Sequence, residues 1–279
     1  MKWCRSSDQA QAYTAAASFV PKLTSTVVSY LDAQPGENIL DIGCGDGPLT
    51  AQIAESVGRE GRVLGLDASK SMIDTAAAKH SSNNCTFQFH DCRQIASSSE
   101  IANGSWDKVF SNAALHWILH ASKTRYQVLQ DVHTALKPGG SFVFEMGGKG
   151  NIAEIHAAII AALTAHGVPL QQARDSSPWF FPSDTWMQAA LEKVGFRVQK
   201  CELEYRPTKL NPDSADGTGG LEGWVRLMGA QMLESVEQSK VDNVVRQVVQ
   251  TLESVITREE DGSQWIGYVR LRAVAIKPT

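Results

Sequence analysis

Three alternating glycines follow an acidic residue in the stretch 39–48, which reads Ile-Leu-Asp-Ile-Gly-Cys-Gly-Asp-Gly-Pro. Glycine lets the backbone approach another group closely and adopts positive φ without penalty. The helix expected from Pro48 presents unpaired N–H groups, which favour an anionic ligand. Because the G-x-G-x-G spacing differs from the G-x-G-x-x-G of dinucleotide enzymes, a nicotinamide-dependent oxidoreductase is the less favoured alternative. The residues expected to bind a cofactor here are Asp41, Gly43, Cys44 and Gly45.

An acidic residue also ends the next apolar run, residues 62–67. Asp67 lies 20 residues after Gly47, the separation at which an acidic side chain commonly binds a ribose. Helix capping is the structural alternative for Asp67, but Ser69 is better placed to cap the following helix. We therefore expect Asp67 to accept hydrogen bonds from a ribose, with Ala68 and Met72 beside it.

Two further strand ends continue this series of polar residues. The expected third strand, 86–92, ends in Asp91 and Cys92, and the fourth, 106–112, ends at Asn112. These residues follow the glycine loop in the same order as the motifs of class I S-adenosylmethionine (SAM)-dependent methyltransferases, which they resemble. The resemblance implies that Asp91 binds the adenine amino group, that the Cys92 N–H binds a ring nitrogen, and that Asn112 joins the site. It also implies S-adenosylhomocysteine (SAH) as the product.

The stretch 111–117, Ser-Asn-Ala-Ala-Leu-His-Trp, is similar to the group of trans-aconitate and malonyl-carrier-protein methyltransferases. Those enzymes esterify carboxylates, so the resemblance implies methyl transfer to a carboxylate or hydroxyl oxygen of a small molecule. His116 is the candidate catalytic residue, as an acceptor contact or a general base; merely shaping the pocket is its alternative. Candidate acceptor contacts are Trp117, Trp179, Phe180 and Arg206. Methylation of carbon or nitrogen, and a non-catalytic SAM-binding regulatory role, remain alternatives.

Strand-like and helix-like segments alternate along the chain, which is typical of an α/β protein with a parallel sheet. Right-handed crossovers bring the strand ends to one edge, where ligands bind. Together with the resemblance, this predicts a Rossmann-like, seven-stranded, mostly parallel sheet with helices on both faces. Residues 196–198 are expected to open the sixth strand, and residues 268–273 alternate like the seventh.

A single domain is expected over residues 1–279, with a core of about 35–150 plus 183–206 and 264–277. A helical lid is expected from segments 1–30, 147–182 and 221–260. Tyr13, in the first of these segments, is expected either to close over the cofactor or to pack in the core. Arg270 and Arg272 share one face of the last strand; they either anchor a carboxylate or lie on a solvated or helix-contacting face.

Composition argues against several classes of protein. The chain carries 26 Lys and Arg against 30 Asp and Glu, a formal charge of −4, and its basic residues are scattered, so no nucleic-acid partner is expected. No apolar run approaches the ~20 residues of a membrane span, and no signal-peptide core is found. The five dispersed cysteines suit the cytoplasm. His116 and His120 lack a nearby third ligand, so no metal is expected. The oligomeric state is left open.

Overall fold

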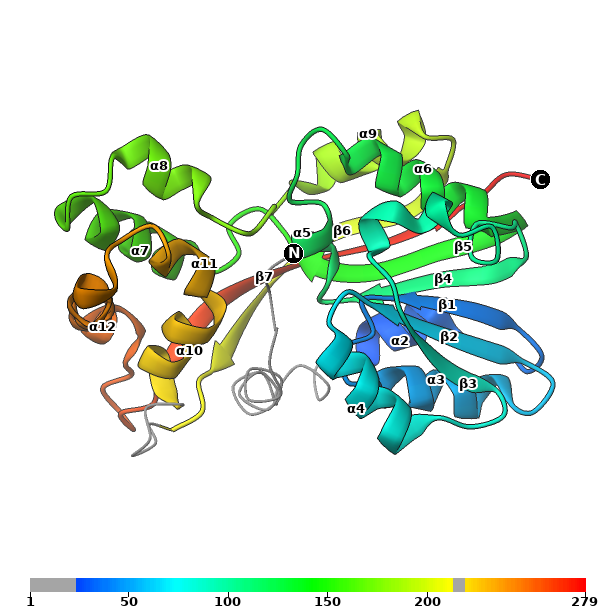
Figure 1. Ribbon diagram of the computed structural model, residues 1–279, viewed down its shortest axis with the longest axis horizontal. Coiled ribbons are helices and arrows are strands. Elements are labelled where there is room, and N and C mark those ends of the chain that lie inside the picture. Colours follow the sequence, from blue (N-terminus) through cyan, green and yellow to red (C-terminus); the bar gives the residue numbers. More distant parts are fainter. Residues whose placement is uncertain (1–23, 213–218) are drawn as a thin grey trace.

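The structure is a computed structural model that describes residues 24–212 and 219–279. Tyr13, one of the predicted cofactor residues, lies outside these described residues. Within them, seven strands form one sheet in the order β3-β2-β1-β4-β5-β7-β6 (Figure 1). The strands are β1 (Asn38–Ile42), β2 (Arg62–Asp67), β3 (Cys85–Phe89), β4 (Trp106–Asn112), β5 (Leu136–Gly147), β6 (Arg197–Lys209) and β7 (Trp265–Ile276).

Most strand pairs in this sheet are parallel. Strands β1 to β5 pair in parallel, whereas β7 runs antiparallel to both of its neighbours, β5 and β6. The expected seven-stranded, mostly parallel sheet is therefore confirmed. Because β1 and β4 lie side by side at the centre, the carboxyl ends of β1, β2 and β4 share one edge of the sheet, where ligands of open α/β sheets bind.

Each face of the sheet buries its own apolar layer, because successive side chains of a strand point to opposite faces. On one face, α2 (Ser25–Leu31) and α3 (Pro48–Val57) pack over Ile39 and Val63. On the other, α5 (Leu115–Ile118), α6 (Arg125–Ala135) and α9 (Asp184–Lys193) pack over Leu40 and Phe142. Figure 1 shows these two layers below and above the sheet, with α4 (Lys70–His80) beside α3.

A second apolar cluster lies outside the sheet, among helices that follow β5 and β6. These are α7 (Ala153–Ala165), α8 (Leu170–Asp175), α10 (Gly220–Met228), α11 (Ala230–Leu233) and α12 (Val241–Ile256). The short 3-10 helices η2 (Cys92–Ser97) and η3 (Gln238–Lys240) complete the described helices. The helical layer stands at the left of Figure 1, at the far end of the β6–β7 strand pair. It contains most of the second and third predicted lid segments.

The last two strands are longer than the sequence pattern predicts. β6 pairs with β7 from Arg197 opposite Ile276 to Lys209 opposite Trp265, whereas β5 pairs with β7 only as far as Gly147 opposite Arg270. The antiparallel β6–β7 pair therefore continues beyond the other strands of the sheet, towards the helical layer. β6 is an edge strand with many charged and exposed residues, as edge strands commonly are, so it lacks the apolar alternation by which a strand is found in a sequence.

Candidate functional site

One pocket lies at the carboxyl edge of the sheet, where β1, β2, β3 and β4 end. It is lined by Gly43, Gly45, Asp67, Ala68, Met72, Asp91, Cys92, Asn112, Ala113, Ala114, Trp117 and Ile118. Eight of the predicted cofactor residues thus meet in one cavity, joined by Trp117, a predicted acceptor contact. Sequence reasoning missed Ala113, Ala114 and Ile118. The pair of small residues directly after a strand was the available signal, because a ligand approaches the backbone closely there.

The glycine loop is held close to the segment that follows β4. The N–H groups of Gly43 and Cys44 both donate to the Leu66 carbonyl, at 2.8 and 3.0 Å, and so fasten the loop to β2. Gly43 has φ +78°, and a Cβ built on it would lie 2.2 Å from Cβ of Ala114. No larger residue fits here without moving one wall of the pocket.

Asp67 holds its carboxylate at the pocket through hydrogen bonds from the backbone. Its Oδ2 accepts from the Gly45 N–H at 3.1 Å and its Oδ1 accepts from the Ser69 N–H at 2.8 Å. Burial raises the pKa of Asp67, and these backbone hydrogen bonds oppose that rise. A carboxylate has acceptor sites for about four hydrogen bonds, so Asp67 can accept further ones from a ligand. Ser69 caps α4 by accepting from the Met72 N–H.

Asp41 and Cys44 are absent from the pocket lining and lie beside the loop. The Asp41 side chain is buried, and its Oδ2 accepts from Thr50 Oγ1 at 2.7 Å, which ties β1 to α3. Burial raises the pKa of Asp41 to about 7, with a smaller contribution from the neighbouring charge of Asp67. The Cys44 side chain packs against Gly65 of β2. Asp41 and Cys44 therefore stabilise the glycine loop from the side that faces away from the pocket.

Asp91 reaches the pocket but is already engaged. Its Oδ1 accepts from the Arg93 N–H at 3.0 Å and from Arg93 Nε at 2.9 Å, so that Asp91 both caps η2 and pairs with the guanidinium. Partial burial would raise the pKa of Asp91, but hydrogen bonds from Arg93 hold it below its ordinary value. Cys92, the first residue of η2, presents a backbone N–H that the helix does not use.

Asn112 presents an acceptor that the described residues leave unsatisfied. Its Oδ1 is buried, and no described donor lies within hydrogen-bond distance of it. A buried polar atom without a partner costs about 1–3 kcal/mol, so a ligand with an N–H or O–H group is the expected partner. The next residue, Ala113, has φ +56°, and its N–H donates to the Glu145 carbonyl at 2.8 Å. This bond fixes the unusual backbone beside the pocket.

His116 is a neutral imidazole whose tautomer is set by the backbone. The Gly147 N–H donates to His116 Nδ1 at 3.3 Å, so the ring proton belongs on Nε2. Burial, reinforced by the positive charge of Arg270, lowers the pKa of His116 to about 3. A group this weakly basic does not take up a proton near neutral pH. The geometry therefore favours His116 as a hydrogen-bond donor through Nε2–H over the general base considered from the sequence.

Aromatic rings continue from the pocket at the carboxyl edge of the sheet into the helical layer. Trp117 lines the pocket, and its ring centroid lies 5.8 Å from that of Trp179. Trp179 stacks on Phe181 at 6.0 Å, and Phe181 lies 5.8 Å from His116. The predicted contact Phe180 packs instead against Trp186, with the Arg125 guanidinium 3.5 Å above its ring. In an extended Trp-Phe-Phe run, adjacent side chains point to opposite sides, and sequence alone does not say which one faces the site.

Glu145 at the end of β5 binds three arginines. Its carboxylate accepts from Arg270 Nε at 2.9 Å, from Arg272 Nε at 2.6 Å and from Arg206 Nη2 at 3.2 Å. Burial would raise the pKa of Glu145, but the three guanidinium groups hold it below its ordinary value. The solvated face considered for Arg270 and Arg272 is wrong, because their side chains are only 4% exposed. The sequence gives no sign of Glu145 as their common partner.

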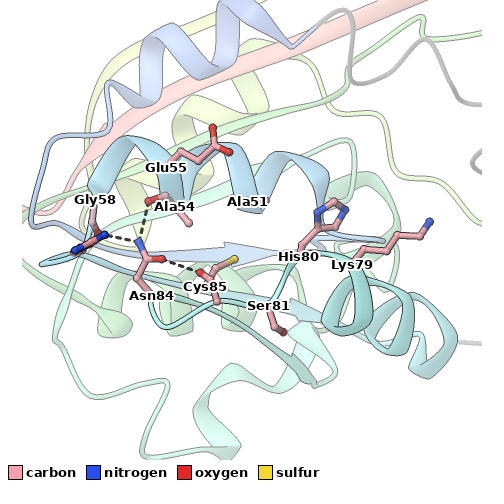
Figure 2. A pocket seen from close by; sticks show the side chains of 11 residues that line it. Ala51, Ala54, Glu55, Gly58, Lys79, His80, Ser81, Asn84 and Cys85 are labelled. Carbon is pink, nitrogen blue, oxygen red and sulfur yellow. Dashed lines mark hydrogen bonds between the residues drawn. The ribbon is translucent and has the colours of Figure 1, made fainter.

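A second cleft lies at the opposite edge of the sheet, where α3 and α4 end (Figure 2). Its volume is about 510 Å³, enough for a small ligand. Its central polar side chain, Asn84, already donates to the carbonyls of Ala54 and Gly58 at 2.9 and 2.8 Å. Cys85 is buried, and burial raises its pKa to about 11, so the thiol is unreactive. We assign no ligand to this cleft.

Comparison with known proteins identifies relatives along almost the whole chain. Residues 33–171 match the profile of a family described as a methyltransferase domain. A Schizosaccharomyces pombe protein described as an uncharacterized methyltransferase is 36% identical over 268 residues, which are 96% of this chain and 97% of that protein. Within residues 24–212 and 219–279, no helix is long and apolar enough to cross a membrane.

Shorter matches reach enzymes with named acceptors. Trans-aconitate 2-methyltransferase of Deinococcus radiodurans is 34% identical over 107 residues, which are 38% of this chain and 36% of that protein. Malonyl-[acyl-carrier protein] O-methyltransferase 1 of Coxiella burnetii is 32% identical over 120 residues, 43% of this chain and 37% of that protein. These matches confirm the resemblance to this group. Phosphoethanolamine N-methyltransferase 2 of Haemonchus contortus shares the fold, with a TM-score of 0.56, 20% identity, and coverage of 98% of this chain and 58% of that one.

Proposed function

This chain belongs to the methyltransferase family, and on that premise we propose that it transfers the methyl group of SAM to an oxygen atom of a small-molecule acceptor. The observation that carries the proposal is the pocket at the carboxyl edge of the sheet. There the Asp67 carboxylate and the unsatisfied Asn112 Oδ1 line one cavity with the glycine loop. The Haemonchus enzyme of the same fold was solved with SAH bound.

The residues of the pocket fit the parts of SAM. Asp67 would accept from the ribose hydroxyls, Asn112 Oδ1 from the ammonium group, and the Cys92 N–H would donate to the adenine ring. Asp91 would accept a hydrogen bond from the adenine amino group. Its carboxylate would then be shared with Arg93, whose Nε lies 2.9 Å from Oδ1 and 3.0 Å from Oδ2. When bound, SAM supplies an electrophilic methyl group on a sulfonium. No metal enters this proposal, and the described residues hold no cluster of three metal-ligating side chains.

We assign His116 the task of positioning the acceptor. A neutral histidine with its proton on Nε2 donates a hydrogen bond and leaves a lone pair of an acceptor oxygen free to attack. Holding an oxygen in line with the methyl carbon, about 3 Å away in a dry site, supplies roughly 7–11 kcal/mol of the barrier. A carboxylate is ionised at neutral pH and needs no base, whereas a hydroxyl must lose its proton. A donor at this position therefore supports the carboxylate.

We further propose that the helical layer of α7, α8 and α10 to α12 covers the acceptor as a lid. Trp179 supports this role, because it joins that layer to Trp117 of the cofactor pocket. A single domain over residues 1–279 and a cytoplasmic location are part of the same proposal. The described cysteines are all free thiols, as in a reducing compartment.

A transfer assay tests the proposal. The purified chain is incubated with methyl-labelled SAM and a panel of small carboxylic acids and phenols, and each product is identified by mass spectrometry. We expect an O-methyl product, mostly esters, and a roughly 10- to 100-fold lower turnover in His116→Gln, for loss of one hydrogen bond to a charged oxygen. His166→Gln, on the C-cap of α7, is the matched control and keeps full turnover. Products methylated only at nitrogen or carbon would overturn the assignment of oxygen, and bound SAM without any transfer would favour the regulatory role.

A further inference from the structure

His156 carries a buried polar atom that no other described residue satisfies. It lies on α7, and its Nε2 is buried without a hydrogen-bond partner among the residues that the structure describes. Buried polar side-chain atoms are as a rule hydrogen-bonded, because leaving one without a partner is costly. Burial also lowers the pKa of His156, so its imidazole is neutral near neutral pH. His156 therefore has an unused capacity for one neutral hydrogen bond.

The surroundings of His156 do not favour a trapped water as the missing partner. Ile155 and Ile159, its neighbours on α7, belong to the apolar cluster of the helical layer, as does Trp179. The His156 ring lies edge-on to Trp179, with 5.5 Å between the ring centroids. A buried water makes about three hydrogen bonds, and a cluster of apolar side chains supplies few partners for it. A polar group that a ligand brings in is the better candidate.

Ring contacts connect His156 to the proposed acceptor site. Trp179 stacks on Phe181 with 6.0 Å between the ring centroids, and the Phe181 centroid lies 5.8 Å from that of His116. The stacked pair therefore lies between His156 and His116, the proposed donor to the methylated oxygen. Trp179 also contacts Trp117, which lines the pocket. An acceptor that extends from His116 along the stacked rings would reach His156 at its far end.

We infer that His156 binds a second, uncharged polar group of the acceptor and so selects acceptors that carry one. This inference rests on the proposed function and narrows its acceptor class. A hydroxyl is the expected group, because it both donates and accepts and so pairs with either tautomer of the imidazole. A charged group is disfavoured, since burying it among apolar side chains costs more than one neutral partner restores.

The Trp179 ring must turn away from His156 to admit that hydroxyl. Trp179 lies on the irregular segment between α8 and α9, and such segments are more mobile than the helices they connect. In this account Trp179 shields the apolar cluster until the acceptor replaces its contact with His156.

Pairs of ligands that differ by one hydroxyl test this selection on the SAH-saturated full chain. Calorimetric titrations compare resorcinol with phenol, 4-hydroxybenzoate with benzoate, and 3-hydroxybutanoate with butanoate. We expect wild type to bind the hydroxylated member of at least one pair about 2- to 12-fold more tightly, the effect of one neutral hydrogen bond. His156→Phe keeps a flat ring without polar atoms, and it should bind both members equally with unchanged SAH affinity. His166→Phe, at the C-cap of α7, is the matched control and should keep the preference.

Urea unfolding supplies a second measurement, which needs no acceptor. His156→Phe and His156→Leu both remove the unpartnered nitrogen from its apolar surroundings. At least one of them should therefore unfold at the same urea concentration as wild type or at a higher one, because no hydrogen bond is lost. That variant is then used in the titrations. A lower midpoint in both variants would overturn the inference, because a partner would already hold Nε2.

The titrations separate this inference from the proposed function. Equal binding or no binding within every pair in wild type would overturn the inference, and so would a preference that survives in the His156 variant. Transfer would then proceed equally well to acceptors with and without the second hydroxyl. Failure of the proposed function has a different signature, since the hydroxylated ligands would bind through His156 but methyl-labelled SAM would give no O-methyl product.

Discussion

Replacing Glu145 by glutamine removes the one charge that holds three arginines together at the end of β5. The side chain is 1% exposed, and Arg270 and Arg272 beside it are each 4% exposed, so water does not take the place of the carboxylate. Breaking a buried ion pair by neutralising one partner costs about 3–5 kcal/mol, because the other partner is left as an uncompensated buried charge. We expect Glu145→Gln to lower the free energy of unfolding by that amount.

The same effect has a defined dependence on pH. The pKa of Glu145 in the folded protein lies below its ordinary value of 4.5, because the three guanidinium groups outweigh the effect of burial. A depressed pKa gives a stability contribution that is complete above the unfolded pKa and is lost as pH falls through the folded pKa. The stability gap between wild type and Glu145→Gln should therefore be constant above about pH 5.5 and should narrow below pH 4.5.

Urea denaturation followed by tryptophan fluorescence measures this gap at a series of pH values. Glu222→Gln is the control, because its ion pair with Arg226 is 47% and 36% exposed and exposed pairs contribute only about 0–1 kcal/mol. If Glu145→Gln lowered the free energy of unfolding by less than about 1 kcal/mol, the reasoning would be refuted. The buried ion pairs of Glu145 would then contribute no more stability than an exposed ion pair. A gap that widens in acid would refute the assigned direction of the pKa shift.

Two other predictions concern the pocket. Gly43→Ala should abolish SAM binding in a calorimetric titration, because the new Cβ would lie 2.2 Å from Cβ of Ala114 and the backbone has positive φ. Gly36→Ala is the control. Its backbone also has positive φ, but the space around it is open, so SAM binding should be retained. Because the pKa of His116 is about 3, the pH profile of turnover between pH 6 and 8 should have the same shape in wild type and His116→Gln, although turnover falls. If the pH profile of the wild type showed an inflection between pH 6 and 8 that is absent from the profile of His116→Gln, His116 would be a general base after all.

The pocket at the carboxyl edge of the sheet was predictable because its residues are tied to strand ends. Glycines, Asp67 and Asn112 each follow an apolar run, and the topology of parallel strands alone brings such positions to one edge. Pairing between side chains was not predictable in the same way. Arg93 follows Asp91 by two residues, yet only the turn into η2 shows that it folds back on the carboxylate.

The surroundings of Glu145 and of the aromatic run were less predictable because distant segments build them. Glu145 meets Arg270 across 125 positions, and that contact exists only because β7 inserts between β5 and β6. Alternation correctly placed Arg270 and Arg272 on one face of a strand but did not say what covers that face. The choice between Phe180 and Phe181 likewise depends on the direction of an irregular segment, whose backbone is fixed by the Phe180 N–H donating to the His116 carbonyl at 2.9 Å.

The central claim, a SAM site built around Asp67, is tested most directly by calorimetric titration of wild type and Asp67→Ala with SAM, SAH and NADH. We predict that wild type binds SAM and SAH but not NADH. Asp67→Ala should bind both sulfur nucleotides at least about 100-fold more weakly, because two hydrogen bonds to a charged acceptor are lost. Asp74→Ala, which removes an exposed carboxylate on α4, should leave all affinities unchanged. Binding of NADH, or equal SAM affinity in Asp67→Ala and wild type, would contradict the account.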